Sequence, residues 1–193
     1  MKKKLKNLAI LASGNGSTLQ AIIDAINNNE LDANIKIVIT NTSKAYALTR
    51  AHKAGINNYI LKDYNDEEEL YNILNKNNVD LIVLAGYLKL LPQKIIDNYI
   101  IINTHPALLP KYGGKGMYGM FVHRKIVENH EKETGATIHF VNEEYDKGKI
   151  ISQTKVKVSP SDTPKDVSDK VQAAEKIQLI KVLKDFSEGK IDI

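Results

Sequence analysis

Residues 7–26, NLAILASGNGSTLQAIIDAI, combine a buried strand, a glycine turn and an amphipathic helix. Asn7–Ala12 is apolar enough for a strand that is covered on both of its faces. Ser13–Thr18, the glycine turn, follows it directly. From Leu19 to Ile26 the apolar residues then recur at the spacing of one helix face. This strand–turn–helix unit predicts an α/β fold.

The same alternation continues along the chain. Apolar strands that alternate with helices indicate a parallel sheet covered on both faces. In the first half, the predicted strands are 35–40, 58–61, 79–85 and 100–104, and the predicted helices are 45–54 and 67–75. In the second half, a long loop over 107–119 precedes a helix at 121–129, strands at 134–142 and 150–158, and a terminal helix at 166–186. We therefore expect one doubly wound, mostly parallel α/β domain with C-terminal strands and a long terminal helix.

The composition excludes several classes of protein. The chain has 193 residues and no cysteine, which excludes disulfides, thiolate metal sites and cysteine nucleophiles and fits a cytoplasmic protein. Its longest apolar stretches, such as Val79–Gly86, are too short to span a bilayer, so we expect no membrane partner. The net charge is +4, from 27 basic and 23 acidic residues, with only two arginines and no basic stripe. We expect no nucleic-acid partner, and the charge suits a small anionic substrate.

The glycine turn has two interpretations. Glycines bring backbone N–H groups close to an anion, a helix start adds its positive dipole end, and Ser17 and Thr18 add hydroxyl donors, which together suit a phosphate. The alternative is a simple strand-to-helix turn with a capping residue. If a phosphate binds here, a phosphomonoester fits best. Leu19 replaces the third glycine of a dinucleotide site, and the Gly-Lys-Ser/Thr of a nucleotide P-loop is absent.

Asn103-Thr104-His105-Pro106 lies at the end of a predicted strand, at the carboxyl edge where open α/β sheets bind ligands. Residues i and i+2 share one face of a strand, so the amide of Asn103 and the imidazole of His105 should point the same way. An amide N–H and a protonated histidine could stabilise an oxyanion in acyl transfer, and histidine can also move a proton. The alternative is a core histidine beside a turn-forming asparagine.

Thr137 and His139 share one face of a later strand, and the turn Tyr145-Asp146-Lys147-Gly148 follows it. A carboxylate such as Asp146 can hold a nearby histidine protonated, although in isolation its position favours a turn residue. His52, His123 and His130 receive no role. No histidine and carboxylate set has metal-ligand spacing, so no metal is expected.

Together these segments resemble the phosphoribosylglycinamide formyltransferase family. The matching stretches occur in the family's order across about residues 8–175. They are Leu11–Ser17, Leu84–Leu91, Asn103–Pro110, Gly114–Gly119, Thr134–Val141 and Asp146–Gly148. The resemblance implies a Rossmann-like formyltransferase fold, with residues 1–100 as its phosphate-binding half and 101–193 as its catalytic and folate-binding half.

The resemblance also implies roles for individual residues. Asn103, His105 and Asp146, hereafter the trio, match the catalytic residues: His105 acts on the transferring formyl group, Asn103 holds its oxygen, and Asp146 orients His105 and raises its pKa. Thr137 and His139 support the trio without contacting the substrate. The ribonucleotide would bind Gly16, Ser17, Thr18 and Glu175. The folate would bind Leu88, Lys89, Leu90, Leu91, Asn103, Glu143 and Glu144.

The implied reaction moves a formyl group from 10-formyltetrahydrofolate to the amine of glycinamide ribonucleotide, a step of purine (IMP) synthesis. The partners are then small molecules, and the enzyme is a monomer or a homodimer. One alternative is a related formyl-handling enzyme, such as formyltetrahydrofolate hydrolase. Another is an inactive α/β protein that only binds phosphate. Lys149, Lys176, Leu179 and Glu67 depart from the family's pattern without touching the trio.

Overall fold

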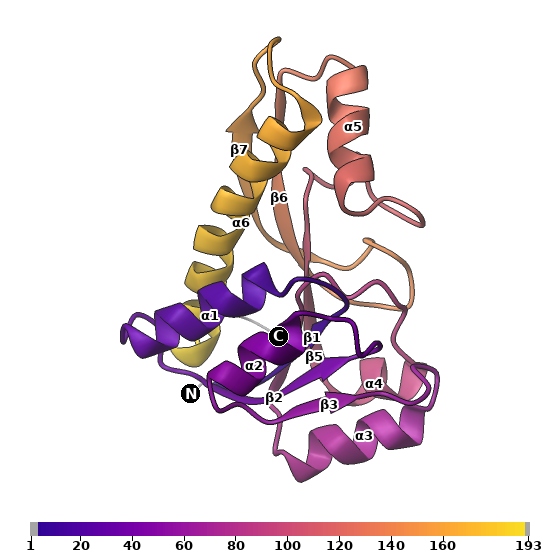
Figure 1. Cartoon of the computed structure of the whole chain (residues 1–193), viewed down its shortest axis with the longest axis vertical. Helices are drawn as coiled ribbons and strands as arrows, with labels where there is room; N and C mark the ends of the chain where they lie inside the picture. Colours follow the sequence, from indigo (N-terminus) through magenta and orange to yellow (C-terminus); the bar gives the residue numbers. More distant parts are fainter. Residues whose placement is uncertain (1–3, 192–193) are drawn as a thin grey trace. The chain divides into compact units, whose positions relative to one another are not determined.

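The computed structural model describes residues 4–191, which contain seven strands and six helices (Figure 1). The strands are β1 (Asn7–Ala12), β2 (Asn34–Thr40), β3 (Asn58–Ile60), β4 (Leu81–Leu84), β5 (Ile100–His105), β6 (Glu133–Phe140) and β7 (Ile150–Lys157). The helices are α1 (Ser17–Asn27), α2 (Ala47–Lys53), α3 (Glu67–Lys76), α4 (Gln93–Asn98), α5 (Met120–Glu128) and α6 (Pro164–Ser187). This confirms the predicted α/β class with its C-terminal strands and long terminal helix.

The chain divides into two compact units. The first holds residues 4–102 and 183–191, and the second holds residues 103–182. β5 begins in the first unit and ends in the second, so the trio and the glycine turn belong to different units. The organisation as a single domain stays a prediction.

In the first unit the strand order is β3-β2-β1-β4-β5. β1 pairs in parallel with both β2 and β4, and β2 pairs in parallel with β3. Right-handed crossovers therefore place α1 and α2 on one face of the sheet and α3 and α4 on the other, as Figure 1 shows. The central strands β1 and β4 are buried almost throughout. Their carboxyl ends lead into the glycine turn and into Ala85–Leu91.

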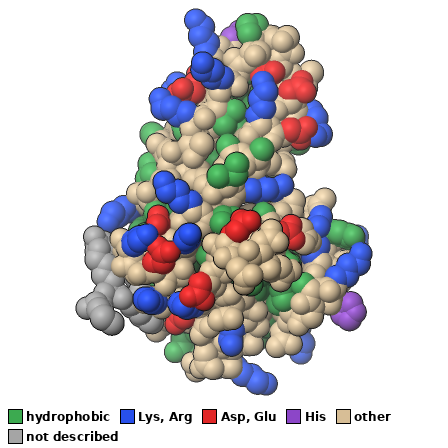
Figure 2. Space-filling model, turned by 90° about the vertical axis from the view of Figure 1, so that its left-hand side faces the viewer, with side chains coloured by type: hydrophobic (Ala, Val, Ile, Leu, Met, Phe, Trp, Pro, Cys, Tyr) green, Lys and Arg blue, Asp and Glu red, His purple; other side chains and the backbone are tan. Residues whose placement is uncertain are grey.

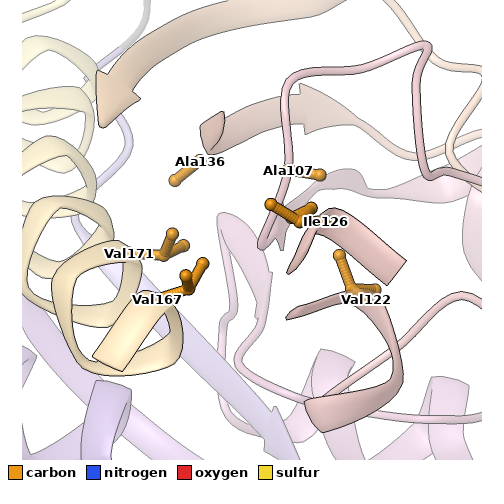
Figure 3. Packing of buried hydrophobic residues seen from close by; sticks show 6 residues of the cluster. All are labelled: Ala107, Val122, Ile126, Ala136, Val167 and Val171. Carbon is orange, nitrogen blue, oxygen red and sulfur yellow. The ribbon is translucent and has the colours of Figure 1, made fainter. Parts of the chain in front are cut away.

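The second unit is built around the end of β5 and the antiparallel pair β6–β7. Its core is a cluster of fully buried small and branched side chains. Figure 3 shows Val167 and Val171 of α6 on one side and Val122 and Ile126 of α5 on the other, with Ala107 and Ala136 near them. The cluster includes Ala107, which directly follows the end of β5, and Ala136 of β6.

The structure adds one helix that the sequence did not predict, and the strand predicted at 79–85 is markedly shorter. α4 has six residues, of which only Ile95 is buried, so it is too short to show a helical apolar period. The predicted strand 79–85 forms only over Leu81–Leu84. Asp80 lies outside the ladder, and its carboxylate accepts a hydrogen bond from the Asn7 amide at 3.1 Å.

Figure 2 shows basic side chains interspersed with acidic ones over the face in view. Within residues 4–191, no helix is both long enough and apolar enough to cross a bilayer.

Candidate active site

The glycine turn reverses the chain between β1 and α1. Gly16 is the N-cap residue of α1 and has a left-handed backbone with φ of +72°. A β-carbon there would lie 2.9 Å from the Cα of Ala47, so both the conformation and the space require glycine. Because a glycine cap has no side chain, it leaves the first N–H groups of α1 without a side-chain acceptor from the capping position. The turn has no side-chain cap, and an anion site at the start of α1 remains a prediction.

Ser13 ties the turn to the segment after β4. Its amide donates to the Gly86 carbonyl at 3.1 Å, and its hydroxyl donates to Asn41 Oδ1 at 2.7 Å. The same hydroxyl accepts a hydrogen bond from the amide of Leu88 at 3.1 Å. The turn is therefore held in place by its neighbours before any ligand arrives.

The residues expected to contact folate lie in both units. In the first unit Leu88 and Leu90 are exposed, while Leu91 is buried and the Lys89 ammonium lies 4.5 Å from the centre of the Tyr64 ring. In the second unit Glu143 and Glu144 are exposed in the segment between β6 and β7. The folate contacts of these residues remain predictions.

The trio comes together inside the second unit. Nδ1 of His105 lies 3.4 Å from Oδ2 of Asp146, and Nδ2 of Asn103 lies 3.5 Å from its Oδ1. The side chains of His105 and Asp146 are only 4% and 9% exposed. Asn103 and His105 alternate along β5 and both reach the same carboxylate, as their spacing predicts.

His139 determines which way the Asn103 amide points. Its Nδ1 donates to the Phe140 carbonyl at 2.7 Å, so in the neutral ring Nε2 carries a lone pair. Nε2 then accepts a hydrogen bond from Nδ2 of Asn103 at 3.1 Å. The second N–H of that amide has only the long contact with Asp146 and can turn to a substrate oxygen.

Two backbone groups of the loop after β5 complete the cluster, and the sequence did not reveal either. The Tyr112 carbonyl accepts a hydrogen bond from Nε2 of His105 at 2.7 Å, and the Gly114 amide donates to Oδ2 of Asp146 at 2.8 Å. Tyr112 has a φ of +56°, which is uncommon for a residue other than glycine. Its hydroxyl donates to Glu131 Oε1 at 3.0 Å and accepts from Asn129 Nδ2 at 2.8 Å. These side-chain bonds hold a strained backbone in position.

Burial and three neighbouring groups together set the protonation of His105. Burial lowers the pKa of His105, and the nearby His139 lowers it further, while Asp146 and the Tyr112 carbonyl raise it. Burial outweighs the rest, so the pKa lies below its ordinary value and the neutral ring is favoured at pH 7. Asp146 does act in the expected direction, but it does not determine the net result.

Asp146 itself is stabilised as a carboxylate. Burial raises its pKa, but three neighbours together outweigh burial: the His139 ring, whose Nε2 lies 3.5 Å from Oδ1, His105, and the Gly114 amide. The pKa of Asp146 therefore lies below its ordinary value. A neutral imidazole between two acceptors, the carboxylate and the Tyr112 carbonyl, is arranged to take up one proton.

Thr137 fixes the segment that follows His105. Its buried hydroxyl donates to the Ala107 carbonyl at 2.7 Å and accepts from the Leu109 amide at 3.1 Å. Nε2 of Gln153 donates to the same hydroxyl at 3.0 Å and to the Leu109 carbonyl at 2.9 Å. Thr137 thus supports the trio through the backbone and has no contact with it.

Glu175 lies on the other face of β5. Its Oε1 accepts a hydrogen bond from Thr104 at 3.1 Å, and Thr104 alternates with Asn103 and His105 along the strand. The residue is 8% exposed. Thr104 holds it at the strand end.

His123 on α5 is buried, and its Nδ1 has no hydrogen-bond partner among the described residues. Burial is the largest cause that lowers its pKa; with His105 lowering it and Asp169 raising it, the pKa falls from 6.5 to about 4. The unfolded chain therefore binds a proton that the folded chain rejects, and stability should fall as the pH drops from 6.5 to about 4.

The substitution His123→Leu removes this titrating group. Between pH 6.5 and about 4, we therefore expect the melting temperature of the variant to fall less than that of the wild type. An unchanged slope in the variant would contradict the assignment.

The chain is similar to known proteins in both sequence and structure. Residues 6–183 match the family model described as formyl transferase. The chain is 38% identical over 195 residues to phosphoribosylglycinamide formyltransferase of Haemophilus influenzae, covering 97% of this chain and 90% of that protein. It is 36% identical to the Escherichia coli protein of the same name, covering 96% and 89%. A crystal structure of phosphoribosylglycinamide formyltransferase from Anaplasma phagocytophilum superposes with a TM-score of 0.88 at 32% identity, covering 98% and 91%.

Proposed function

This chain belongs to the formyl transferase family and transfers a formyl group in purine synthesis, and we propose that Asn103, His105 and Asp146 carry out the transfer. The donor would be 10-formyltetrahydrofolate and the acceptor the amine of glycinamide ribonucleotide. The observation that carries the proposal is the buried cluster in which His105 and Asn103 both reach Asp146, at 3.4 and 3.5 Å.

The chemistry follows from the charges that develop. The amine attacks the formyl carbon, a C–N bond forms, and the carbonyl electron pair moves to the oxygen. The Asn103 N–H that makes only the long contact stabilises this oxyanion. The amine proton passes to the neutral His105, whose imidazolium form lies between Asp146 and the Tyr112 carbonyl. The intermediate then breaks its bond to the folate nitrogen, which takes the proton and leaves.

Substrate binding uses groups outside the trio. The phosphate of the ribonucleotide would bind the backbone and hydroxyls of Gly16, Ser17 and Thr18 at the start of α1. Glu175, held by Thr104, would bind the cationic end of the glycinamide group before it loses its proton. Leu88–Leu91 and the segment with Glu143 and Glu144 would contact the folate, largely through backbone groups. A cytoplasmic location and a monomeric or homodimeric state remain predictions.

One assay separates this proposal from its alternatives. The purified protein is mixed with a 10-formyl folate analogue, with and without glycinamide ribonucleotide, and loss of the formyl group is followed optically. We expect release that requires the ribonucleotide. Release without it would indicate a hydrolase, and no release under either condition would indicate a binding protein.

A further inference from the structure

The chain has only two arginines, and one of them, Arg50, donates hydrogen bonds to the glycine turn. We propose that Arg50, on α2, is a positioning residue that holds Gly14–Gly16 in the conformation that binds the phosphate of the ribonucleotide. The inference rests on the proposed function, because it concerns the substrate group that the turn would bind. Arg50 acts through the backbone of the turn.

Arg50 makes two hydrogen bonds to the turn and one to α1. Its Nε donates to the Asn15 carbonyl at 2.8 Å, and its Nη2 donates to Asn15 Oδ1 at 2.8 Å. Its Nη1 donates to Oε1 of Gln20 on α1 at 3.0 Å. Nε2 of Gln20 in turn donates to Asp24 Oδ1 at 2.9 Å, which fixes the Gln20 oxygen toward the guanidinium. One planar group thus joins the turn, α1 and α2.

Ala47, at the start of α2, also restricts the conformation of the turn. The Ala47 amide donates to the Gly14 carbonyl at 3.2 Å, and the Cα of Ala47 fills the space where Gly16 would carry a side chain. The Tyr46 ring centre lies 5.0 Å from the Arg50 guanidinium, which favours its position by a cation–π contact. These contacts matter because glycines have the widest backbone freedom, and an unrestrained turn would have to be ordered by the ligand.

Lysine cannot replace this arrangement. An ammonium is a single point donor on a flexible chain, whereas the guanidinium presents donors in a fixed plane that matches both oxygens of Asn15. Substitution of Arg50 by lysine or methionine should therefore loosen the turn without removing a group of the trio. The effect should be confined to ligands that carry a phosphate.

The test compares a substrate with and without its phosphate. For Arg50→Lys and Arg50→Met we expect KM for glycinamide ribonucleotide to rise about 10-fold, as when one or two residues must be ordered on binding. KM for the formyl folate, kcat, and kcat/KM for phosphate-free glycinamide riboside should stay within about 2-fold of wild type, inside the usual scatter of a remote substitution. The matched control is Arg124→Lys, because the Arg124 Nε has a 3.4 Å contact with Met120 within α5.

A binding titration with ribose 5-phosphate, followed by ³¹P NMR, tests the phosphate site and the role of Arg50 separately. If the wild-type protein does not bind it, the phosphate site of the proposed function is wrong. If the wild type and both Arg50 variants bind it equally, the role of Arg50 is wrong and the proposed function stands. A uniform loss of activity toward ribonucleotide and riboside, with a lower melting temperature, would also overturn the inference, because it would make Arg50 merely structural.

Discussion

Replacing Asp146 with asparagine is expected to lower kcat for formyl transfer by about 10²–10⁴-fold, the usual contribution of a positioned acid–base group. The substitution removes the charge that stabilises the imidazolium of His105 but keeps an oxygen that can accept from the Gly114 amide. The fold should therefore survive. Steady-state kinetics with a melting curve measure both quantities, and a loss in kcat below about 10-fold would exclude Asp146 from the proton transfer.

The pH profile and a double variant sharpen this prediction. Asp146 raises the pKa of His105, so its removal should move the acid limb of kcat/KM to lower pH in the residual activity. His105→Asn should cause a loss of similar size. Because the two side chains act as one unit, the double variant should be little worse than either single variant. Fully additive losses would show that the two residues act independently.

Gly148→Ala is expected to reduce both stability and turnover. A β-carbon at this position would lie 1.7 Å from the Phe140 carbonyl oxygen, a backbone atom that cannot move aside alone. The same carbonyl accepts the hydrogen bond from Nδ1 of His139, so the displacement would reach His139 as well as the turn of Asp146. Overpacking of this kind costs about 1–3 kcal/mol, or roughly 2–12 °C in melting temperature for a chain of this size.

Gly14→Ala is the matched control for stability. A β-carbon on Gly14 meets nothing within 4 Å, and its φ lies outside the left-handed region. Its melting temperature should stay within about 2 °C of wild type, as for a substitution without a new contact. If Gly148→Ala melts at the wild-type temperature and keeps full activity, the close approach to Phe140 does not constrain the turn of Asp146.

Much of the fold could be predicted because its strands and helices carry strong local patterns. β1 forms over Asn7–Ala12, as its apolar run indicates, and α1 buries the stripe that begins at Leu19. α4 was missed because six residues between Pro92 and Tyr99 are too few for a period to appear. Short elements of this kind depend on their neighbours and leave little trace in their own residues.

The candidate site, like the fold, could be predicted only in part. The strand spacing placed Asn103 and His105 on one face, and the resemblance connected them to Asp146 from about forty residues away. The net pKa of His105 could not be predicted from the sequence, because burial lowers it more than Asp146 raises it. Arg50 and Tyr112 were missed because Arg50 acts at a distance of 35 residues and Tyr112 acts through its backbone.

The side chain and the backbone carbonyl of Tyr112 have separate roles, and a side-chain substitution tests only the first. Its phenol anchors the loop to Glu131 and Asn129, while its carbonyl accepts the hydrogen bond from Nε2 of His105. Alanine or phenylalanine at position 112 keeps that carbonyl, so a scan of side-chain replacements would report the anchor and overlook the acceptor. An amide-to-ester exchange of the bond that joins residues 112 and 113 would weaken the acceptor and leave the phenol intact.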